Sequence, residues 1–149
     1  MSDFSNVLMI IFLSIFPISE LRGAIPLGIS LGFSPLFVFL ISIFFNSIIF
    51  FPIYFGLELL YERFFCRFSF VRKILKRIEK KRDAIDKYGF LGLVLFVAIP
   101  APFTGAYTAS ALAWLLGLDW KKSFLVIAFG VVIAGIIVSA FTLGILKLF

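Results

Sequence analysis

The sequence predicts an all-α integral membrane protein in which a helical hairpin followed by a spanning helix occurs twice. Three observations predict this fold class. Of the 149 residues, 62% are hydrophobic and only 15% are charged, whereas soluble chains are typically ~45–50% apolar and ~25% charged. The apolar segments differ in length, because breaks containing proline and glycine interrupt some of them. The basic residues are concentrated in one stretch near the middle of the chain.

The length predicts a single membrane domain that covers residues 1–149. We expect a first repeat at about 4–60, a basic amphipathic interfacial helix at about 61–87 and a second repeat at about 89–147. In each repeat a re-entrant helical hairpin comes first and a transmembrane helix follows. Because one crossing separates the two hairpins, they would enter the membrane from opposite faces, which is an inverted-topology repeat.

The hairpins are predicted from apolar segments that are too short to cross a bilayer. Residues 4–16 are followed by a break at 17–26, and residues 90–99 are followed by a break at 100–105. At ~1.5 Å per helical residue such segments reach only ~15–20 Å, whereas the hydrocarbon core is ~30 Å thick. A chain that turns back inside the membrane fits these lengths. One long kinked helix in each place is the alternative.

The placement of charge favours the hairpins. The runs 36–60 and 123–146 are long enough to span. With two hairpins, the basic stretch 61–87 and the pair Lys121–Lys122 lie on the same side of the membrane, as the positive-inside rule requires. With four full spans they would lie on opposite sides. We therefore expect a multi-pass protein with residues 61–87 in the cytoplasm and both termini outside.

Small residues recur at similar places in the two halves. A Gly-Ala pair occurs at each break, and small residues then occur at every fourth position. The positions are Ala24, Gly28 and Gly32 in the first half and Gly105, Ala109, Ala113 and Gly117 in the second. Such ridges let helix backbones approach closely in lipid. Their recurrence supports the internal repeat.

The basic stretch has the pattern of an amphipathic helix at the membrane surface. Apolar residues in it follow helical spacing, and basic residues fill most of the other positions. Candidate contacts to anionic lipid head groups are Arg72, Lys73, Lys76, Arg77, Lys80 and Lys81. A solvated connector that serves only topology is the alternative. Nucleic-acid binding is not expected, because no nucleic-acid-binding fold remains once the apolar segments are assigned.

The first break contains the only charged residues between Asp3 and Glu58, namely Glu20 and Arg22, with Gly23 beside them. Charged residues deep in a bilayer cost ~2.5–3.5 kcal/mol each on insertion scales and usually mark a pathway. At a spacing of two they point to different sides of a regular helix, so either the backbone is broken there or each has its own partner. We predict that Arg22 holds an anionic group and that Glu20 exchanges a proton. The alternative is a mutually neutralised pair that fixes the turn.

The second break supplies further candidate site residues. They are Pro100, Pro102, Thr104 and Gly105, to which Tyr107 and Asn46 could add hydrogen bonds. For each of these residues the alternative is a satisfied contact between helices.

Two residues predict where the returning helices begin. Thr104 is placed to cap the N-terminus of the helix after the second break, and Pro26 suits the first turn of its counterpart. Both helices would then point positive N-termini toward the membrane centre. Together with Arg22, this predicts a site for an anionic group such as a phosphate.

The composition argues against an enzyme. The chain has no histidine and one cysteine, Cys66, so it has no Cys/His metal site and no internal disulfide. It also lacks a nucleophile–base pair and a pair of carboxylates inside the membrane. We expect no metal and no cofactor.

Two segments resemble the signature regions of the small multidrug export protein family. They run from Ser19 to Gly28, with the sequence SELRGAIPLG, and from Pro100 to Tyr107, with the sequence PAPFTGAY. That family is distantly similar to the DedA/VTT membrane proteins, in which opposed re-entrant hairpins carry acidic and arginine residues. The resemblance implies a plasma-membrane protein and assigns Glu20 to the acidic residue of the first hairpin. Lipid scrambling or polyprenyl-phosphate recycling is ascribed to some DedA/VTT members, whose second hairpin carries an arginine that residues 100–107 lack.

Two classes of function follow from the sequence. The first is a proton-coupled secondary transporter or flippase that moves an amphipathic or lipid-like substrate, possible substrates being anionic amphiphiles or small cationic drugs. The second is a non-transporting scaffold or partner subunit that acts through the basic helix. A homodimer is expected in the first case, because one copy with two full spans encloses little space. Membrane lipids are the expected partners in both.

Overall fold

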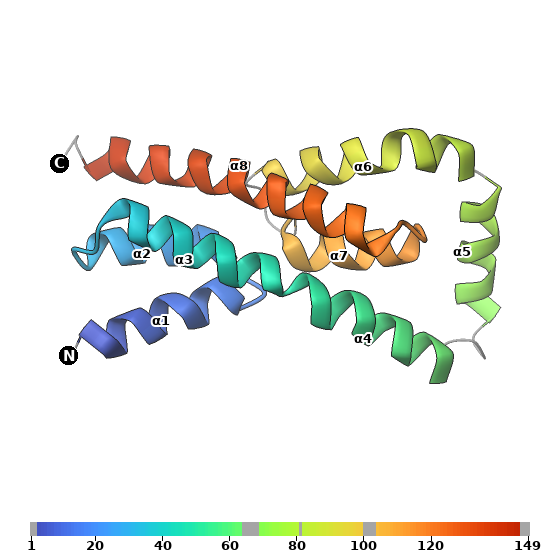
Figure 1. Cartoon of the computed structure of the whole chain (residues 1–149), viewed down its shortest axis with the longest axis horizontal. Coiled ribbons are helices and arrows are strands. Elements are labelled where there is room, and N and C mark those ends of the chain that lie inside the picture. Colours follow the sequence, from blue (N-terminus) through green and yellow to red (C-terminus); the bar gives the residue numbers. More distant parts are fainter. Residues whose placement is uncertain (1–2, 64–68, 81, 100–103, 147–149) are drawn as a thin grey trace.

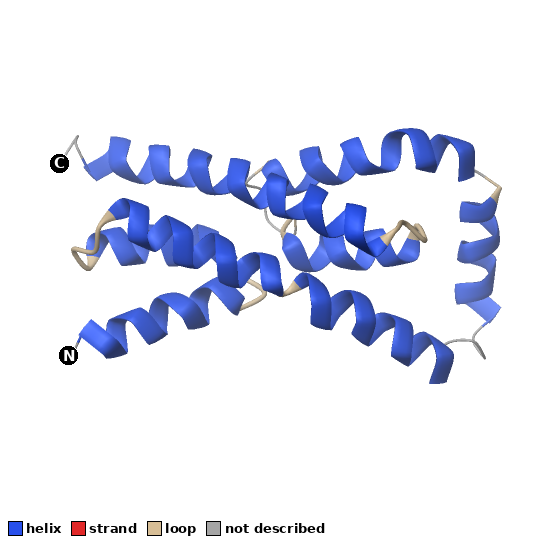
Figure 2. Cartoon of the chain, viewed as in Figure 1, coloured by secondary structure: helices blue, strands red, loops and turns tan. Residues whose placement is uncertain are grey.

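The computed structural model describes residues 3–63, 69–80, 82–99 and 104–146. Within these ranges the regular secondary structure is α-helical throughout, as the sequence predicts (Figure 2). The lengths and order of the helices follow from the breaks that proline and glycine impose on the apolar segments.

The first half of the chain contains a helical hairpin followed by two helices in line. The helices are α1 (Asp3–Ile15), α2 (Glu20–Ser30), α3 (Pro35–Ile48) and α4 (Phe50–Arg63). Helices α1 and α2 lie antiparallel and pack along each other (Figure 1). The first break therefore reverses the chain and does not kink one long helix.

The second half contains a cross-wise helix, a second hairpin and one long helix. The helices are α5 (Ser69–Glu79), α6 (Arg82–Ala98), α7 (Ala106–Leu115) and α8 (Trp120–Leu146). Helix α7 runs antiparallel to α6, and α8 packs on both α6 and α7 (Figure 1). The second break also reverses the chain.

The helices form an elongated bundle in which the two reversals lie near the middle. Helices α3 and α4 together, and α8 alone, run along most of its length (Figure 1). Helix α1 begins and α8 ends at one end of the bundle, and α5 crosses the other end (Figure 1). Helix α8, whose first turn includes Lys121 and Lys122, begins toward the α5 end (Figure 1).

Two segments in the described ranges are long and apolar enough to cross a membrane. They are Pro35–Arg63, with 29 residues, and Trp120–Leu146, with 27 residues. At ~1.5 Å per residue they reach ~40 Å, which exceeds the ~30 Å hydrocarbon core. Helix α1, with 13 residues, reaches only ~20 Å. The predicted difference between long and short segments is confirmed.

The first long segment is interrupted at Ile49, which lies between α3 and α4. The cause is Pro52, which has no N–H to donate to the carbonyl of Ile48 and whose ring crowds that carbonyl. The run 36–60 was predicted to span the membrane, and the structure has a candidate span over Pro35–Arg63 with this interruption inside it.

The basic stretch is divided among three elements, whereas one helix over 61–87 was predicted. Helix α4 extends to Arg63, α5 covers Ser69–Glu79, and α6 begins at Arg82. Residues 82–87 include alanine, arginine and lysine, which favour helix, so α6 continues the apolar helix backwards into the basic stretch.

The turns after α2 and α7 have the same construction. Gly32 and Gly117 both have a positive φ, 88° and 63°, and they end their helices as left-handed C′ residues. The next residue donates in each case to the carbonyl five positions earlier, Phe33 to Gly28 and Leu118 to Ala113. Both turns use this hydrogen-bond pattern to satisfy carbonyls at the end of a helix.

The helices after these turns also begin alike. Ser34 accepts a hydrogen bond from the N–H of Phe37, and the Asp119 carboxylate accepts one from the N–H of Lys122. Gly117 and Asp119 follow Gly32 and Ser34 at the same interval of 85 residues. At this interval Gly105 corresponds to Glu20. If the two Gly-Ala pairs were aligned instead, Gly105 would correspond to Gly23.

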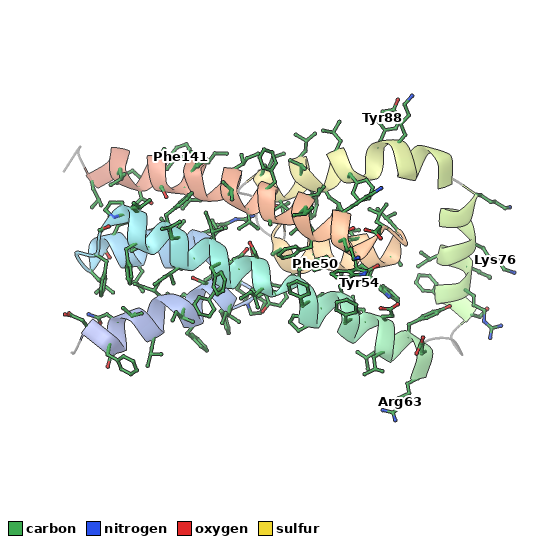
Figure 3. All side chains as sticks on the ribbon, in the orientation of Figure 1. Phe50, Tyr54, Arg63, Lys76, Tyr88 and Phe141 are labelled. Carbon is green, nitrogen blue, oxygen red and sulfur yellow. The ribbon has the colours of Figure 1, made fainter. Side chains whose placement is uncertain are left out.

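Aromatic packing connects α4 with α8 and the turn before it. The rings of Phe50 and Tyr54 stack at 5.2 Å, and Phe51 packs against Phe124 at 4.8 Å. The Tyr54 hydroxyl donates to the carbonyl of Leu118 at 2.8 Å. Figure 3 shows Phe50 and Tyr54 directed into the bundle, whereas Lys76 on α5 points away from it.

Small residues let the helices approach closely, as predicted. Ala24, Gly28, Ala109 and Ala113 are buried. A Cβ atom on Gly28 would lie 2.6 Å from one methyl group of Val38. Gly28 therefore forms a close contact of α2 with α3, and Gly32 and Gly117 act as helix ends.

Gly28→Ala is expected to destabilise the protein by about 1–3 kcal/mol, the usual cost of overpacking a core. The added methyl group would meet Val38 and Ile10, both fully buried and unable to move aside. Gly56→Ala is the matched control, because a Cβ there meets no atom within 4 Å. Melting temperatures of both variants in detergent test this, and equal melting temperatures would contradict the close contact.

Candidate functional site

The site lies where the reversal between α1 and α2 meets the reversal between α6 and α7. The first reversal is the turn Phe16–Ser19, followed by Glu20 at the start of α2. The second includes Ile99 and Thr104, while the predicted site residues Pro100 and Pro102 lie outside the described residues.

The Glu20 carboxylate lies against the N-terminus of α7. It is hydrogen-bonded to the backbone N–H groups of Ala106 and Tyr107 and to the side chain of Asn46. A Cβ atom on Gly105 would overlap both carboxylate oxygens. Glu20 is only 6% exposed, so the side chain is enclosed in this position. The glycine provides the space into which the carboxylate fits.

The backbone at Glu20 is strained. Its φ is +46°, the one positive value for a non-glycine residue in the described ranges. This left-handed conformation is unfavourable for a side chain that carries a Cβ. Strained residues persist where the surrounding structure determines them, and here the strain turns the carboxylate toward α7.

Glu20 takes the capping role that the sequence analysis assigned to Thr104. The N-cap residue of α7 is Gly105, which makes no side-chain capping bond. The first N–H groups of a helix need acceptors, and a negative charge there is favourable because of the helix dipole. The carboxylate of another hairpin meets both needs, so the prediction for Thr104 was wrong.

Arg22 joins the two reversals through hydrogen bonds. Its Nη2 donates to the Thr104 hydroxyl and to the Thr104 carbonyl, both at 3.0 Å, and to the Ile99 carbonyl at 3.4 Å. The Thr104 hydroxyl in turn donates to the Ile99 carbonyl at 2.7 Å. Arg22 is half-buried and also interacts electrostatically with Glu20.

Glu20 and Arg22 were expected either to interrupt the regular helix or to have separate partners, and both are observed. The backbone departs from a regular helix at Glu20, and each side chain has its own partners across the second reversal. Pro26 was expected in the first turn of the returning helix. It lies instead inside α2, which begins six residues earlier at Glu20, because the strained turn already starts the helix there.

Asn46 and Tyr107 connect the site to the end of α1. Asn46 is fully buried, and its Nδ2 donates to the carbonyl of Ser14 at 3.0 Å. The Tyr107 hydroxyl donates to the carbonyl of Ile15. The last carbonyls of a helix need such donors when water is excluded. These contacts are the interhelical alternative that the sequence analysis allowed.

Two cavities meet at Arg22. One of about 470 Å³ is lined by the first turn, α4 and α7, and includes Glu20, Gly105 and Tyr107. Another of about 780 Å³ lies between α2 and the last third of α8. Arg22 lines both. The buried acid and the arginine are therefore next to space that a small molecule could occupy.

A family model with the description "Putative small multi-drug export protein" matches residues 20–137. This range begins at Glu20 and includes Arg22, Asn46, Thr104, Gly105 and Tyr107. The chain belongs to this small multidrug export family. No curated protein and no solved structure matches this chain. The family and the apolar helices together indicate a membrane protein.

The basic residues that were predicted to contact lipid head groups lie away from the site. Arg72, Lys73, Lys76, Arg77 and Lys80 are exposed on or just after α5, at the end of the bundle (Figure 1). Lys81 lies outside the described residues.

Gly23 does not line either cavity. A Cβ atom on Gly23 would lie 2.8 Å from the Cβ of Ser19. Glycine at this position therefore permits the tight turn before α2.

Several groups of the site could not be found from sequence patterns. The carbonyls of Ser14, Ile15 and Ile99 and the first N–H groups of α7 are backbone atoms in apolar stretches. Residue type gives no sign of them. The breaks were the available signal, since freed backbone groups inside a membrane must be satisfied by something.

Proposed function

We propose that the protein is a secondary transporter that moves an amphipathic or lipid-like substrate past Glu20 and Arg22, coupled to protons. The observation that carries this proposal is the contact between the two reversals. A buried acid caps a helix of the other hairpin, and a neighbouring arginine lines two cavities. Ionisable residues inside a membrane usually mark a pathway or a proton relay.

The hairpins are, in this proposal, re-entrant. The α1–α2 and α6–α7 pairs enter from opposite membrane faces and turn near the midplane, which makes the two halves an inverted repeat. The positions of the reversals halfway along α3–α4 and α8 support this (Figure 1). The hydrogen bonds from Asn46, Tyr107 and Arg22 to freed carbonyls support it too, because lipid supplies no partners.

The proposed orientation in the plasma membrane places α5 on the cytoplasmic side. Helix α5 and the start of α8, which carries Lys121 and Lys122, lie toward the same end (Figure 1), in agreement with the positive-inside rule. Both chain ends are then outside. Exposed basic residues of α5, such as Lys76 in Figure 3, contact anionic lipid head groups in this orientation.

Proton coupling would work through competition at the N-terminus of α7. The ionised Glu20 carboxylate supplies the negative charge that this helix end favours. A protonated Glu20 lacks that charge, so an anionic substrate group held by Arg22 can take its place. The Asn46 Oδ1 atom, which is buried and has no partner among the described residues, can then accept a hydrogen bond from the protonated Glu20 carboxyl.

An exporter of small cationic drugs is the second candidate. Glu20 lines the cavity of about 470 Å³, and a buried carboxylate attracts cations. Arg22, which lines both cavities, favours an anionic group over a cation. A scaffold that acts through α5 stays a further prediction, which transport measurements test. A homodimer also stays a prediction, and cross-linking tests it.

Glu20→Gln is expected to remove the pH-driven component of transport. The amide keeps the size of the side chain but cannot exchange a proton. Purified protein is reconstituted in vesicles with and without a pH gradient. Uptake of a fluorescent dodecyl phosphate and of ethidium is measured. We expect the gradient-dependent part to fall by about tenfold or more, equivalent to at least ~1.4 kcal/mol.

The matched control is Glu62→Gln, which changes an exposed acid near the end of α4. It should transport like the unmodified protein. Unchanged gradient-driven uptake in Glu20→Gln would exclude the proton-coupling role. Uptake of neither probe by the unmodified protein would favour the scaffold, and uptake of ethidium alone would favour the cation exporter.

A further inference from the structure

The cavity of about 780 Å³ is an apolar groove with one charged residue. Helix α2 lines one wall and residues 137–146 of α8 line the other. Leu27, Val138 and Phe141 are typical of the lining. Its two hydroxyl groups donate within their own helices, Ser30 to the Leu27 carbonyl and Thr142 to the Val138 carbonyl. The groove therefore offers hydrocarbon contact along its walls.

The charged residue is Arg22, which marks one end of the groove. From Arg22 to Ser30 the α2 wall extends ~12 Å, and from Ile137 to Leu146 the α8 wall extends ~13 Å at 1.5 Å per residue. These lengths are a little under half of the ~30 Å hydrocarbon core. In the proposed orientation the groove thus runs from the midplane to one membrane face, a distance that matches one leaflet.

The charge pattern selects the class of molecule that fits. A planar guanidinium at the midplane end binds phosphate, sulfate or carboxylate through paired N–H donors. An ammonium group would be repelled there. Arg22 also lines the cavity that contains Glu20, so an anionic group bound at Arg22 is within reach of the proposed coupling site.

We propose that the groove between α2 and α8 binds the single apolar chain of an anionic amphiphile whose head group lies at Arg22. This narrows the substrate class of the proposed function and rests on the same site. Binding in the groove can nevertheless be measured without transport, so each claim can fail alone.

The test uses dodecyl phosphate with a photoreactive diazirine near the end of its chain. The full chain is reconstituted in phosphatidylcholine nanodiscs, illuminated and digested, and labelled peptides are identified by mass spectrometry. We expect labels on residues 26–30 and 137–146. Excess dodecyl phosphate should remove them by competition, whereas inorganic phosphate and dodecyltrimethylammonium should not.

Two substitutions with a matched control complete the test. Thr142→Trp fills the groove midway, and Arg22→Gln removes the charge. Each should lower labelling about tenfold, a loss of ~1.4 kcal/mol in binding. Leu143→Trp, at an exposed neighbouring position outside the groove lining, should leave labelling unchanged. If Arg22→Gln does not fold, the comparison of dodecyl phosphate with dodecyltrimethylammonium as competitors still tests whether the site prefers an anionic head group.

Three results would overturn the proposal. They are labels spread evenly over the lipid-facing helices, equal competition by dodecyltrimethylammonium, and unchanged labelling in Thr142→Trp. Specific labelling without any transport would leave the groove assigned and refute the transporter. Transport of dodecyl phosphate without specific labelling would refute the groove alone.

Discussion

Gly105→Ala is expected to abolish gradient-driven transport as completely as Glu20→Gln does. A methyl group on Gly105 would occupy the position of the Glu20 carboxylate oxygens. The backbone itself would tolerate alanine, because the φ of Gly105 is −106°. The expected loss therefore comes from displacing a carboxylate that is enclosed on other sides.

The displacement should also lower stability. Helix α7 would lose the negative charge at its N-terminus, which contributes ~0.3–1 kcal/mol at exposed sites and up to ~2 kcal/mol at partly buried ones. The overlap itself adds about 1–3 kcal/mol, as for other overpacked cores. A lower melting temperature should therefore accompany the loss of transport.

Two variants test whether the overlap with Glu20 is the cause. Gly92→Ala places the same methyl group on α6, where a Cβ meets no atom within 4 Å, and it should behave like the unmodified protein. Glu20→Asp combined with Gly105→Ala shortens the acid by one methylene group and should recover part of the melting temperature. Full transport and an unchanged melting temperature in Gly105→Ala would mean that Glu20 is not seated against α7.

The sequence predicted the helical hairpins because their cause is local. Segments such as 4–16 are too short to span, and Pro17 and Gly23 mark the break. The turns at Gly32 and Gly117 were visible only as members of a small-residue ridge. The structure assigns them the left-handed ends of α2 and α7, which a spacing pattern does not distinguish from packing positions.

The cap on α7 could not be predicted, because it is a tertiary contact. Thr104 has the residue type and position of an N-cap, and local rules favour it. Arg22 instead uses the Thr104 hydroxyl as an acceptor, and Glu20 from the other half of the chain approaches α7. Only the packing of the two halves determines which acceptor the helix receives.

That contact also corrects the predicted electrostatics of the site. Two helix N-termini and Arg22 were expected to be open to an anion. The α7 N-terminus already has the Glu20 carboxylate beside it, and α2 begins at Glu20 itself. Arg22 is therefore the cation on which recognition of an anionic group depends, and Glu20 must move or take up a proton before α7 can contribute.

Arg22→Gln is expected to destabilise the protein more than Glu20→Gln does. Removing one partner of a fully buried ion pair costs ~3–5 kcal/mol, because the other charge is left without compensation. Arg22 is half-buried, so a smaller cost is expected here. Glutamine can replace one of the hydrogen bonds to Thr104 and Ile99 but cannot supply the positive charge near Glu20.

The double variant Glu20→Gln, Arg22→Gln distinguishes charge compensation from hydrogen bonding. If the isolated carboxylate causes the cost of Arg22→Gln, removing its charge as well should recover stability, and the two single effects will not add. If lost hydrogen bonds to the second reversal cause it, the effects will add. Thermal unfolding followed through Trp114 and Trp120 fluorescence measures this cycle, with Lys76→Gln, an exposed position on α5, as control.

Non-additivity is the expected result, because Glu20 and Arg22 interact electrostatically in a site with little access to water. The same coupling bears on transport. An anionic substrate that takes over the charge of Arg22 weakens the compensation of Glu20 and so favours its protonation. Additive effects in the cycle would remove this link between substrate and proton, even if both residues proved necessary for transport.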